Sequence, residues 1–338
     1  NQPQSTPQTG TPELAARIAA GDRRALAQAI TLAESARPDH QAEAEALLDE
    51  LGPRTRPGLR VGITGAPGVG KSTFIEALGL HLVSTGARVA VLAVDPSSKR
   101  SHGSILGDKT RMPKLSRDER AFIRPSPAGG ALGGIARRTR EAVVLCEAAG
   151  FDTVIVETVG VGQSETAVAG LTDTFVLLIA PGGGGELQGI KRGIVELADL
   201  VIVNKNDGSL APDAGRIAAE YKGALHLLRP ALSQWQPPVL LCSALNAVGL
   251  DEAWAAVLRH RAALESAGEL HNRRGTHALG GMWDEVTSTL LARAREDGRA
   301  AALLPELERK VASGALRPAA AARQLLAALD GAPQDGHK

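Results

Sequence analysis

The chain has 338 residues, of which 43% are hydrophobic and only 2% are aromatic. Its 38 basic and 37 acidic side chains leave a formal net charge of +1, which argues against a nucleic-acid partner held by bulk charge. The shortage of aromatic residues also argues against recognition of RNA by base stacking.

Membrane-spanning and disulfide-rich classes are disfavoured on similar grounds. The longest apolar runs, such as Val89–Val94, have six residues, whereas a membrane-spanning helix needs roughly 20. The two cysteines, Cys146 and Cys242, are far apart, so we expect neither a disulfide framework nor a thiolate zinc site. We therefore expect a cytoplasmic protein without a membrane partner.

The first part of the chain is predicted to be helical. Residues 1–11 are polar and rich in Pro and Gln, which is typical of a disordered leader. In residues 12–58, apolar positions such as Leu14 and Ile18 recur at helical spacing, and Pro38 divides the pattern into two segments. We expect an N-terminal helical extension here.

Residues 59–265 show a different rhythm, in which short apolar runs alternate with helical patterns. Runs that are apolar throughout are typical of strands covered on both faces. The alternation predicts an α/β fold with a doubly wound, mostly parallel sheet, which binds its ligand at the carboxyl ends of the strands. The predicted strands are Val61–Thr64, Arg88–Val94, Phe122–Arg124, Thr153–Val156, Thr174–Ala180, Leu200–Val203 and Val239–Cys242.

The C-terminal part, residues 266–330, is predicted to be a helical arm. The polar, Gly-rich segment Gly268–Gly281 suggests a hinge, and Met282, Val286 and Leu290 form an apolar stripe after it. Such an arm either folds back on the core or meets a second copy of the chain, and we expect the second copy. Residues 331–338 resemble the leader and are expected to be a disordered tail.

A phosphate-binding loop is the strongest motif. GAPGVGKST fits the pattern GxxxxGK[ST], follows a predicted strand and opens a predicted helix. In such a loop the backbone N–H groups surround phosphate oxygens, the lysine reaches the β- and γ-phosphates, and the serine hydroxyl binds Mg²⁺. The nucleotide-binding and phosphate-contacting residues are Gly65, Ala66, Pro67, Gly68, Val69, Gly70, Lys71, Ser72 and Thr73.

The nucleotide is predicted to be GTP, with GDP as product. Asn204, Lys205 and Asp207 form the N-K-x-D arrangement after a predicted strand. The carboxylate of Asp207 can accept two hydrogen bonds from guanine, and adenine lacks that pair of donors. A companion base-contacting loop is expected after the next strand, at Ser243, Ala244 and Leu245.

Metal binding and hydrolysis are assigned to the end of another strand. Glu157 can hold Mg²⁺ directly or through water, and Gly160 can offer its N–H to the γ-phosphate. The next residue, Val161, cannot orient the attacking water, so we expect slow hydrolysis by the chain alone. Asp95 and Asp108 are further candidates for the metal shell, with a helix cap or a turn as the alternative.

Taken together, these motifs resemble those of the MeaB/ArgK-type GTPases, which are associated with methylmalonyl-CoA mutase and related B12-dependent acyl-CoA mutases. The resemblance runs from about residue 14 to about residue 260 and rests on segments in this order: GITGAPGVGKST, AVDPSSKRSHGSILGDKTRM, FIRPSP, ETVGVGQSETAVA, ELQGIKRGIVELAD and VNKND.

The resemblance implies a G-protein chaperone that gates adenosylcobalamin loading of a mutase and protects or reactivates that enzyme. It implies a homodimer joined by the C-terminal arm, an adenosyltransferase as a further partner, and hydrolysis stimulated by a partner. It also places Lys71, Ser72, Asp95, Asp108 and Glu157 at the phosphates and Mg²⁺. Within residues 181–191, it makes Gln188 and Lys191 a switch that couples partner binding to hydrolysis.

Two other interpretations of the sequence stay open. A metallochaperone GTPase would want a cluster of Cys and His ligands, and the eight histidines of this chain are scattered. A transport-associated kinase would need an acceptor for the γ-phosphate, and the guanine motif argues against it.

Overall fold

The computed structural model describes residues 10–35, 37–52, 58–95, 112–127, 132–158, 164–182, 192–227, 232 and 234–330. A seven-stranded sheet in the order β3-β2-β4-β1-β5-β6-β7 forms its centre, and every pairing in it is parallel. The predicted fold class is confirmed, because each of the seven apolar runs forms a strand. The strands are β1 Leu59–Thr64, β2 Val89–Asp95, β3 Ala121–Pro127, β4 Thr153–Thr158, β5 Thr174–Ile179, β6 Leu200–Val203 and β7 Val239–Leu241.

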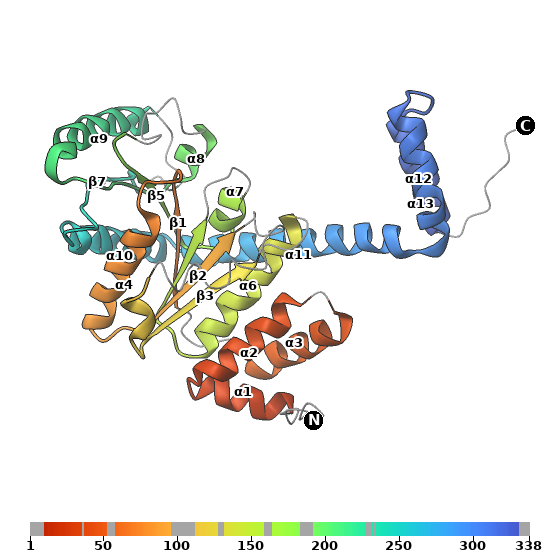
Figure 1. Cartoon of the computed structure of the whole chain (residues 1–338), viewed down its shortest axis with the longest axis horizontal. Coiled ribbons are helices and arrows are strands. Elements are labelled where there is room, and N and C mark those ends of the chain that lie inside the picture. Colours follow the sequence, from red (N-terminus) through yellow and green to blue (C-terminus); the bar gives the residue numbers. More distant parts are fainter. Residues whose placement is uncertain are drawn as a thin grey trace, which may run out of the picture. The chain divides into compact units, whose positions relative to one another are not determined.

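Helices cover both faces of the sheet (Figure 1). On one face, α4 (Lys71–Ser84) and α10 (Leu250–Ser266) share a core with the strands. On the other face lie α6 (Leu132–Ala148) and α7 (Ser164–Ala169), together with α8 (Arg192–Leu197) and α9 (Ala211–His226). This double cover explains why the strand sequences are apolar on both sides.

The N-terminal extension contains three helices, α1 (Thr11–Ala19), α2 (Arg23–Glu34) and α3 (Pro38–Leu51). The prediction of two segments is therefore wrong. The break that it missed lies at Asp22, whose carboxylate accepts hydrogen bonds from the N–H groups of Arg24 at 2.8 Å and Ala25 at 3.1 Å and caps α2. The three helices pack against α6 and extend the core on that face.

The switch point of the sheet lies at β1, which pairs with β4 on one side and β5 on the other. The chain leaves β1 for β2 in one direction across the sheet and later returns to β5 in the other. Ligands of open α/β sheets bind in the crevice at the carboxyl ends of the strands beside such a point. The phosphate-binding loop begins there, directly after Thr64.

The opposite, amino edge of the sheet holds a cluster of buried ion pairs with α11 (Glu269–Glu296). Arg274 forks onto the carboxylate of Asp173, from Nε to Oδ1 at 2.7 Å and from Nη2 to Oδ2 at 2.5 Å. Arg273 donates to Asp199 with both terminal nitrogens, from Nη1 to Oδ2 at 3.1 Å and from Nη2 to Oδ1 at 3.0 Å. Because the two aspartates immediately precede β5 and β6, the start of α11 is tied to both strands.

The segment Gly268–Gly281, predicted to be a hinge, is helical from Glu269 onward, because α11 runs through it. Contacts between residues nevertheless divide the chain into residues 1–280 and residues 281–338. The second unit continues with α12 (Gly298–Ala312) and α13 (Pro318–Leu329), which pack side by side. Asp297 caps α12 by accepting from the N–H groups of Arg299 and Ala300, both at 3.0 Å.

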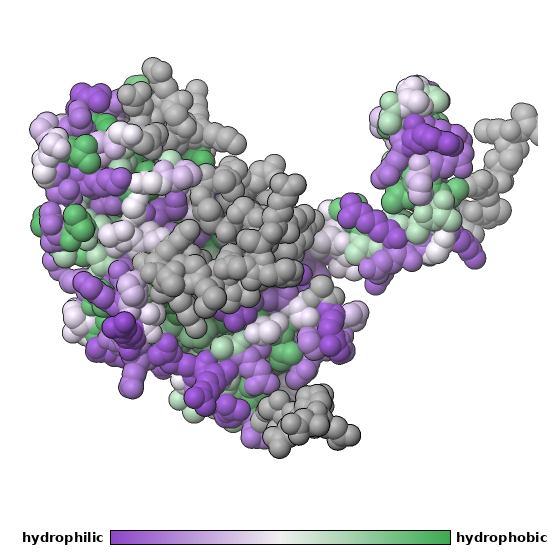
Figure 2. All heavy atoms as spheres, viewed as in Figure 1, coloured by the Kyte–Doolittle hydropathy of each residue, from purple (hydrophilic) through white to green (hydrophobic). Residues whose placement is uncertain are grey.

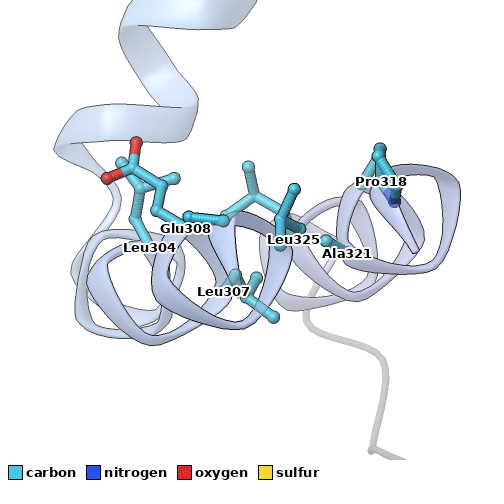
Figure 3. A pocket seen from close by; sticks show the side chains of 9 residues that line it. Leu304, Leu307, Glu308, Pro318, Ala321 and Leu325 are labelled. Carbon is cyan, nitrogen blue, oxygen red and sulfur yellow. The ribbon is translucent and has the colours of Figure 1, made fainter. Parts of the chain in front are cut away.

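Apolar patches interrupt the polar surface of this second unit (Figure 2). Its largest exposed side chain is Trp283, 63% of whose surface is accessible, and Leu290 is 56% exposed. An apolar groove of about 350 Å³ follows the seam between α12 and α13, where Leu307, Ala321 and Leu325 lie (Figure 3). Among the described residues, no helix is long and apolar enough to cross a bilayer.

Candidate nucleotide-binding site

The loop of residues 65–70 joins β1 to α4 and ends at Gly70, whose φ of +93° is left-handed. Gly70 is the N-cap of α4 and has no side chain that could satisfy the first N–H groups of the helix. These groups have no carbonyl partner within the helix, so a helix start of this kind accommodates an anion. A Cβ atom at Gly70 would lie 2.7 Å from Nδ2 of Asn204, which makes glycine necessary at this position.

Lys71 is held inside the same loop. Its Nζ donates to the main-chain oxygens of Gly65 at 2.7 Å and Ala66 at 3.1 Å, and the residue is 9% exposed. The ammonium group is therefore positioned within the bend of the loop that precedes α4. A cation beside the helix start gives this bend a positive potential suited to phosphate oxygens.

Ser72 and Glu157 meet across the sheet edge. The Ser72 hydroxyl donates to Oε1 of Glu157 at 3.2 Å, and Glu157 is buried near the end of β4. Two oxygen-bearing side chains from the phosphate loop and from the neighbouring strand thus converge at one point. Hydroxyl and carboxylate oxygens are the ligands that Mg²⁺ prefers, so the residues present fit this ion.

Asn204 connects the phosphate loop to the second predicted base loop. Its Nδ2 donates to the main-chain oxygen of Val69 at 2.9 Å, and its Oδ1 accepts from the N–H of Ala244 at 3.0 Å. The side chain is almost fully buried. Its amide therefore sets the distance between the loop that starts α4 and the loop that follows β7.

Asp207 and Ser243 also join the two base loops. The Ser243 hydroxyl donates to Oδ2 of Asp207, and the N–H of Asn206 donates to the oxygen of Cys242 at 3.0 Å. Lys205 adopts a left-handed φ of +61°, which turns the chain between Asn204 and Asp207. The Asp207 side chain is half-buried, so it is oriented by Ser243 and still reaches the surface.

The loop after β7 is closed by main-chain hydrogen bonds. Ser243 and Val248 exchange two of them, each 3.0 Å long. Leu245, at the turn of this loop, is 79% exposed. Burial raises the pKa of the neighbouring Cys242 thiol to about 11, so this group stays a neutral thiol below the loop.

A cavity of about 490 Å³ lies beside these loops. One wall is a face of α4 that includes Thr73 and Ala77, and the other includes Ala244 and Leu245. The cavity thus opens between the helix that starts at the phosphate loop and the loop predicted to contact the base. Its lining continues along α4 to His81 and does not include residues 65–70 or Asp207, so the cavity adjoins the predicted nucleotide site without coinciding with it.

Several predicted residues cannot be compared with the structure. Asp95 is the last residue of β2, at the same edge of the sheet as Glu157, but its side chain is outside the described part. Asp108, Gly160, Gln188 and Lys191 are also outside the described residues.

Sequence reasoning missed Glu76, which lies on α4 five residues after Lys71. Its Oε1 accepts from the N–H groups of Lys114 at 2.8 Å and Leu115 at 3.4 Å. These bonds attach the short helix η2 (Leu115–Arg117) to the helix that starts at the phosphate loop. A glutamate on a helix carries no signal of such a contact, because its partners are main-chain atoms 38 and 39 positions away.

Comparison with known proteins identifies the family of this chain. The family model described as "Methylmalonyl Co-A mutase-associated GTPase MeaB" matches residues 26–299. The chain belongs to this family. The predicted resemblance is therefore confirmed, and the chain is a GTPase.

Relatives of this MeaB-family GTPase cover almost its whole length. A "Putative GTPase" of Caulobacter vibrioides is 56% identical over 92% of this chain and 95% of its own. The "Methylmalonic aciduria type A homolog, mitochondrial" of Mus musculus is 49% identical over 91% of this chain and 77% of its own. A crystal structure of a protein called a LAO/AO transport system kinase is 40% identical, covers 96% of this chain and 98% of its own, and has a TM-score of 0.76.

The metallochaperone alternative calls for a cluster of metal-ligating side chains. Within the described part of the chain, no group of three or more His, Cys, Asp or Glu side chains is arranged to hold a metal ion.

Proposed function

We propose that this GTPase uses GTP binding and hydrolysis to control a B12-dependent acyl-CoA mutase, gating adenosylcobalamin loading and protecting or reactivating the mutase. The observation that carries the nucleotide part is the Asn204 amide, which joins the phosphate loop to the base loop beside Asp207. The family description supports the mutase part, since it names a mutase-associated GTPase.

Selection of guanine is assigned to Asp207. Its carboxylate is oriented by the Ser243 hydroxyl and can accept from both the ring N–H and the exocyclic amine of guanine. Adenine lacks this pair of donors and would leave the carboxylate of Asp207 unpaired, which is costly because this group is partly buried. The stem of Lys205 and the exposed Leu245 are placed to lie against the base.

Mg²⁺ would be held by Ser72 and Glu157, with Asp95 and Asp108 as the further predicted ligands. When bound, the ion neutralises charge on the phosphate oxygens. Lys71 binds the β- and γ-phosphates, and the N–H groups at the start of α4 orient them. Gly160 supplies a main-chain donor to the γ-phosphate.

Hydrolysis by the chain alone is proposed to be slow. In many GTPases a glutamine directly after the glycine of this segment orients water, and here that position is Val161. Acceleration then comes from a partner through Gln188 and Lys191. The test is the single-turnover rate with and without a purified B12-dependent acyl-CoA mutase, and we expect a rise with the mutase.

The mutase proposal has a direct binding test. The full chain is loaded with GDP, with a non-hydrolysable GTP analogue or with no nucleotide, and binding to the mutase is measured by calorimetry. We expect an affinity that depends on the nucleotide state. The absence of binding in all three states to methylmalonyl-CoA mutase and its B12-dependent relatives would refute the proposal, whereas retained GTP binding would leave the GTPase assignment intact.

A homodimer joined by residues 266–330 is proposed from the apolar side chains of the second unit. Trp283 and Leu290 are more than half exposed, and exposed apolar patches of this kind mark interaction surfaces. The double variant Trp283→Glu, Leu290→Glu should be monomeric by light scattering. The control is Leu227→Glu, a change at a leucine that is 88% exposed on the other unit, and it should leave the dimer intact. If the double variant is still a dimer, as the control is, the proposal is contradicted.

A kinase activity is the second candidate, because one similar solved structure is that of a protein called a transport system kinase. Transfer of label from γ-labelled GTP to a protein or to a small acceptor would favour it. Release of all label as inorganic phosphate would favour the GTPase-chaperone proposal.

A further inference from the structure

Two threonine hydroxyls meet at the carboxyl edge of the sheet. Thr158 is the last residue of β4 and Thr64 is the last residue of β1. The Thr158 hydroxyl donates to Oγ1 of Thr64 at 2.8 Å, and both side chains are almost completely buried. The phosphate loop begins directly after one of these residues, and the segment leading to Gly160 begins directly after the other.

This pair lies on the opposite face of the sheet from the Ser72–Glu157 contact. Ile155 belongs to the core shared with α4, whereas Val154 and Val156 belong to the core on the α6 side. Because successive side chains of a strand alternate between faces, Glu157 points toward α4 and Thr158 points toward α6. The end of β4 is therefore attached to neighbouring elements from both faces.

Packing alone does not require hydroxyls at these positions. The neighbouring strand residues Ile63 and Val156 are aliphatic and fully buried, and valine has nearly the shape of threonine. A buried hydroxyl is tolerated only when it is hydrogen-bonded. The two threonines satisfy that condition through each other, which adds a side-chain link between the two strand ends directly after the last paired residues, Ile63 and Glu157.

We propose that the Thr64–Thr158 pair is a positioning device for GTP hydrolysis. It acts through the neighbouring Glu157, whose place relative to the phosphate loop it sets. Nucleotide affinity depends on other groups, namely the start of α4, Lys71 and the base loops. Loss of the pair therefore lowers kcat and leaves GDP affinity nearly unchanged, since a small displacement of a positioned group costs more in the transition state than in the bound ground state.

The experiment compares four variants of the full-length protein: Thr158→Val, Thr64→Val, the double variant and Thr158→Ser. Single-turnover hydrolysis, GDP affinity by calorimetry and the free energy of unfolding are measured for each. We expect Thr158→Val and Thr64→Val to reduce the rate about tenfold, with GDP affinity within about twofold of the unsubstituted protein. Thr158→Ser keeps the hydroxyl, so its rate should stay close to that of the unsubstituted protein.

The double variant separates positioning from stability. Two apolar groups facing each other leave no buried hydroxyl unsatisfied, so its free energy of unfolding returns toward that of the unsubstituted protein while its rate stays low. Thr172→Val is the control. The Thr172 hydroxyl is also buried, but it donates to the main-chain oxygen of Val168 at 3.1 Å and does not lie at the carboxyl edge of the sheet. The rate of this variant should not change. An unchanged rate in Thr158→Val, or a rate that recovers along with stability in the double variant, overturns the proposal.

Discussion

The side chain of Asn204 donates from Nδ2 to the main-chain oxygen of Val69 at 2.9 Å, so the loop after β6 supports the phosphate loop directly. The same amide accepts from the N–H of Ala244. The predicted phosphate loop and the predicted base loop are therefore linked through one buried side chain. A change that displaces this side chain should therefore lower the affinity for the nucleotide through both its phosphates and its base.

Gly70→Ala is expected to test this link. The added Cβ would lie 2.7 Å from Nδ2 of Asn204, and the φ of +93° at this position is strained for alanine. We expect GDP and GTP affinity, measured by calorimetry, to fall at least about tenfold, since a misplaced loop loses part of its phosphate contacts.

The matched control is Gly215→Ala on α9, where nothing lies within 4 Å of an added Cβ. This change should leave nucleotide affinity unaltered and raise the free energy of unfolding by up to about 1 kcal/mol, because alanine favours a helix over glycine. Unchanged affinity in Gly70→Ala would contradict the role of the Asn204 clamp.

Asp207→Asn is expected to change the base preference. The asparagine amide presents a donor where the carboxylate accepts from guanine, so GTP affinity should fall and a xanthosine nucleotide should bind instead. Calorimetry with GTP, ATP and xanthosine triphosphate checks this prediction. Unaltered affinity for GTP, or equal binding of ATP by the unsubstituted protein, would show that Asp207 does not read the base.

Arg274→Met is expected to destabilise the first unit strongly. It leaves the Asp173 carboxylate, which is 1% exposed, without its forked partner. Removing one member of a buried ion pair costs about 3–5 kcal/mol, and urea denaturation measures this loss. Arg216→Ala removes an exposed ion pair with Asp213 and should change stability by less than about 1 kcal/mol; equal effects of the two changes would contradict the prediction.

The stability of the first unit should depend on pH through His277. Burial lowers the pKa of its imidazole to about 4, the Arg273 guanidinium adds to this effect, and the Asp173 carboxylate opposes it. The unfolded chain takes up this proton near pH 6.5, so between about pH 6.5 and 4 the unfolded state binds more protons and stability falls as the pH is lowered.

His277→Gln should reduce this pH dependence, as read from the free energy of unfolding in urea at several pH values. His271→Gln, on an exposed position of the same helix, serves as the control and should keep the slope. A slope that is the same with and without His277 would show that another group causes it.

Local patterns in the sequence predicted much of the fold. Seven apolar runs became seven strands, and GAPGVGKST stands between a strand and a helix as expected. The Gly-rich segment Gly268–Gly281 was not expected to be a helix. It is one from Glu269 onward, because glycine weakens a helix by only about 1 kcal/mol per residue and Arg273 and Arg274 hold this segment on the sheet. The break at Asp22 was missed, because the apolar spacing of α1 and α2 reads as one continuous pattern.

The amino-acid sequence by itself determined the kind of nucleotide site that we predict. The phosphate loop and the Asn204–Asp207 motif each consist of a few consecutive residues, so the chemistry of each can be inferred locally. Only the tertiary structure decided how the site is supported. Val69 and Asn204 are 135 positions apart, Arg274 and Asp173 are 101 apart, and Thr64 and Thr158 are 94 apart. Contacts over such separations leave no local periodicity, because they arise only when the strands have been placed side by side.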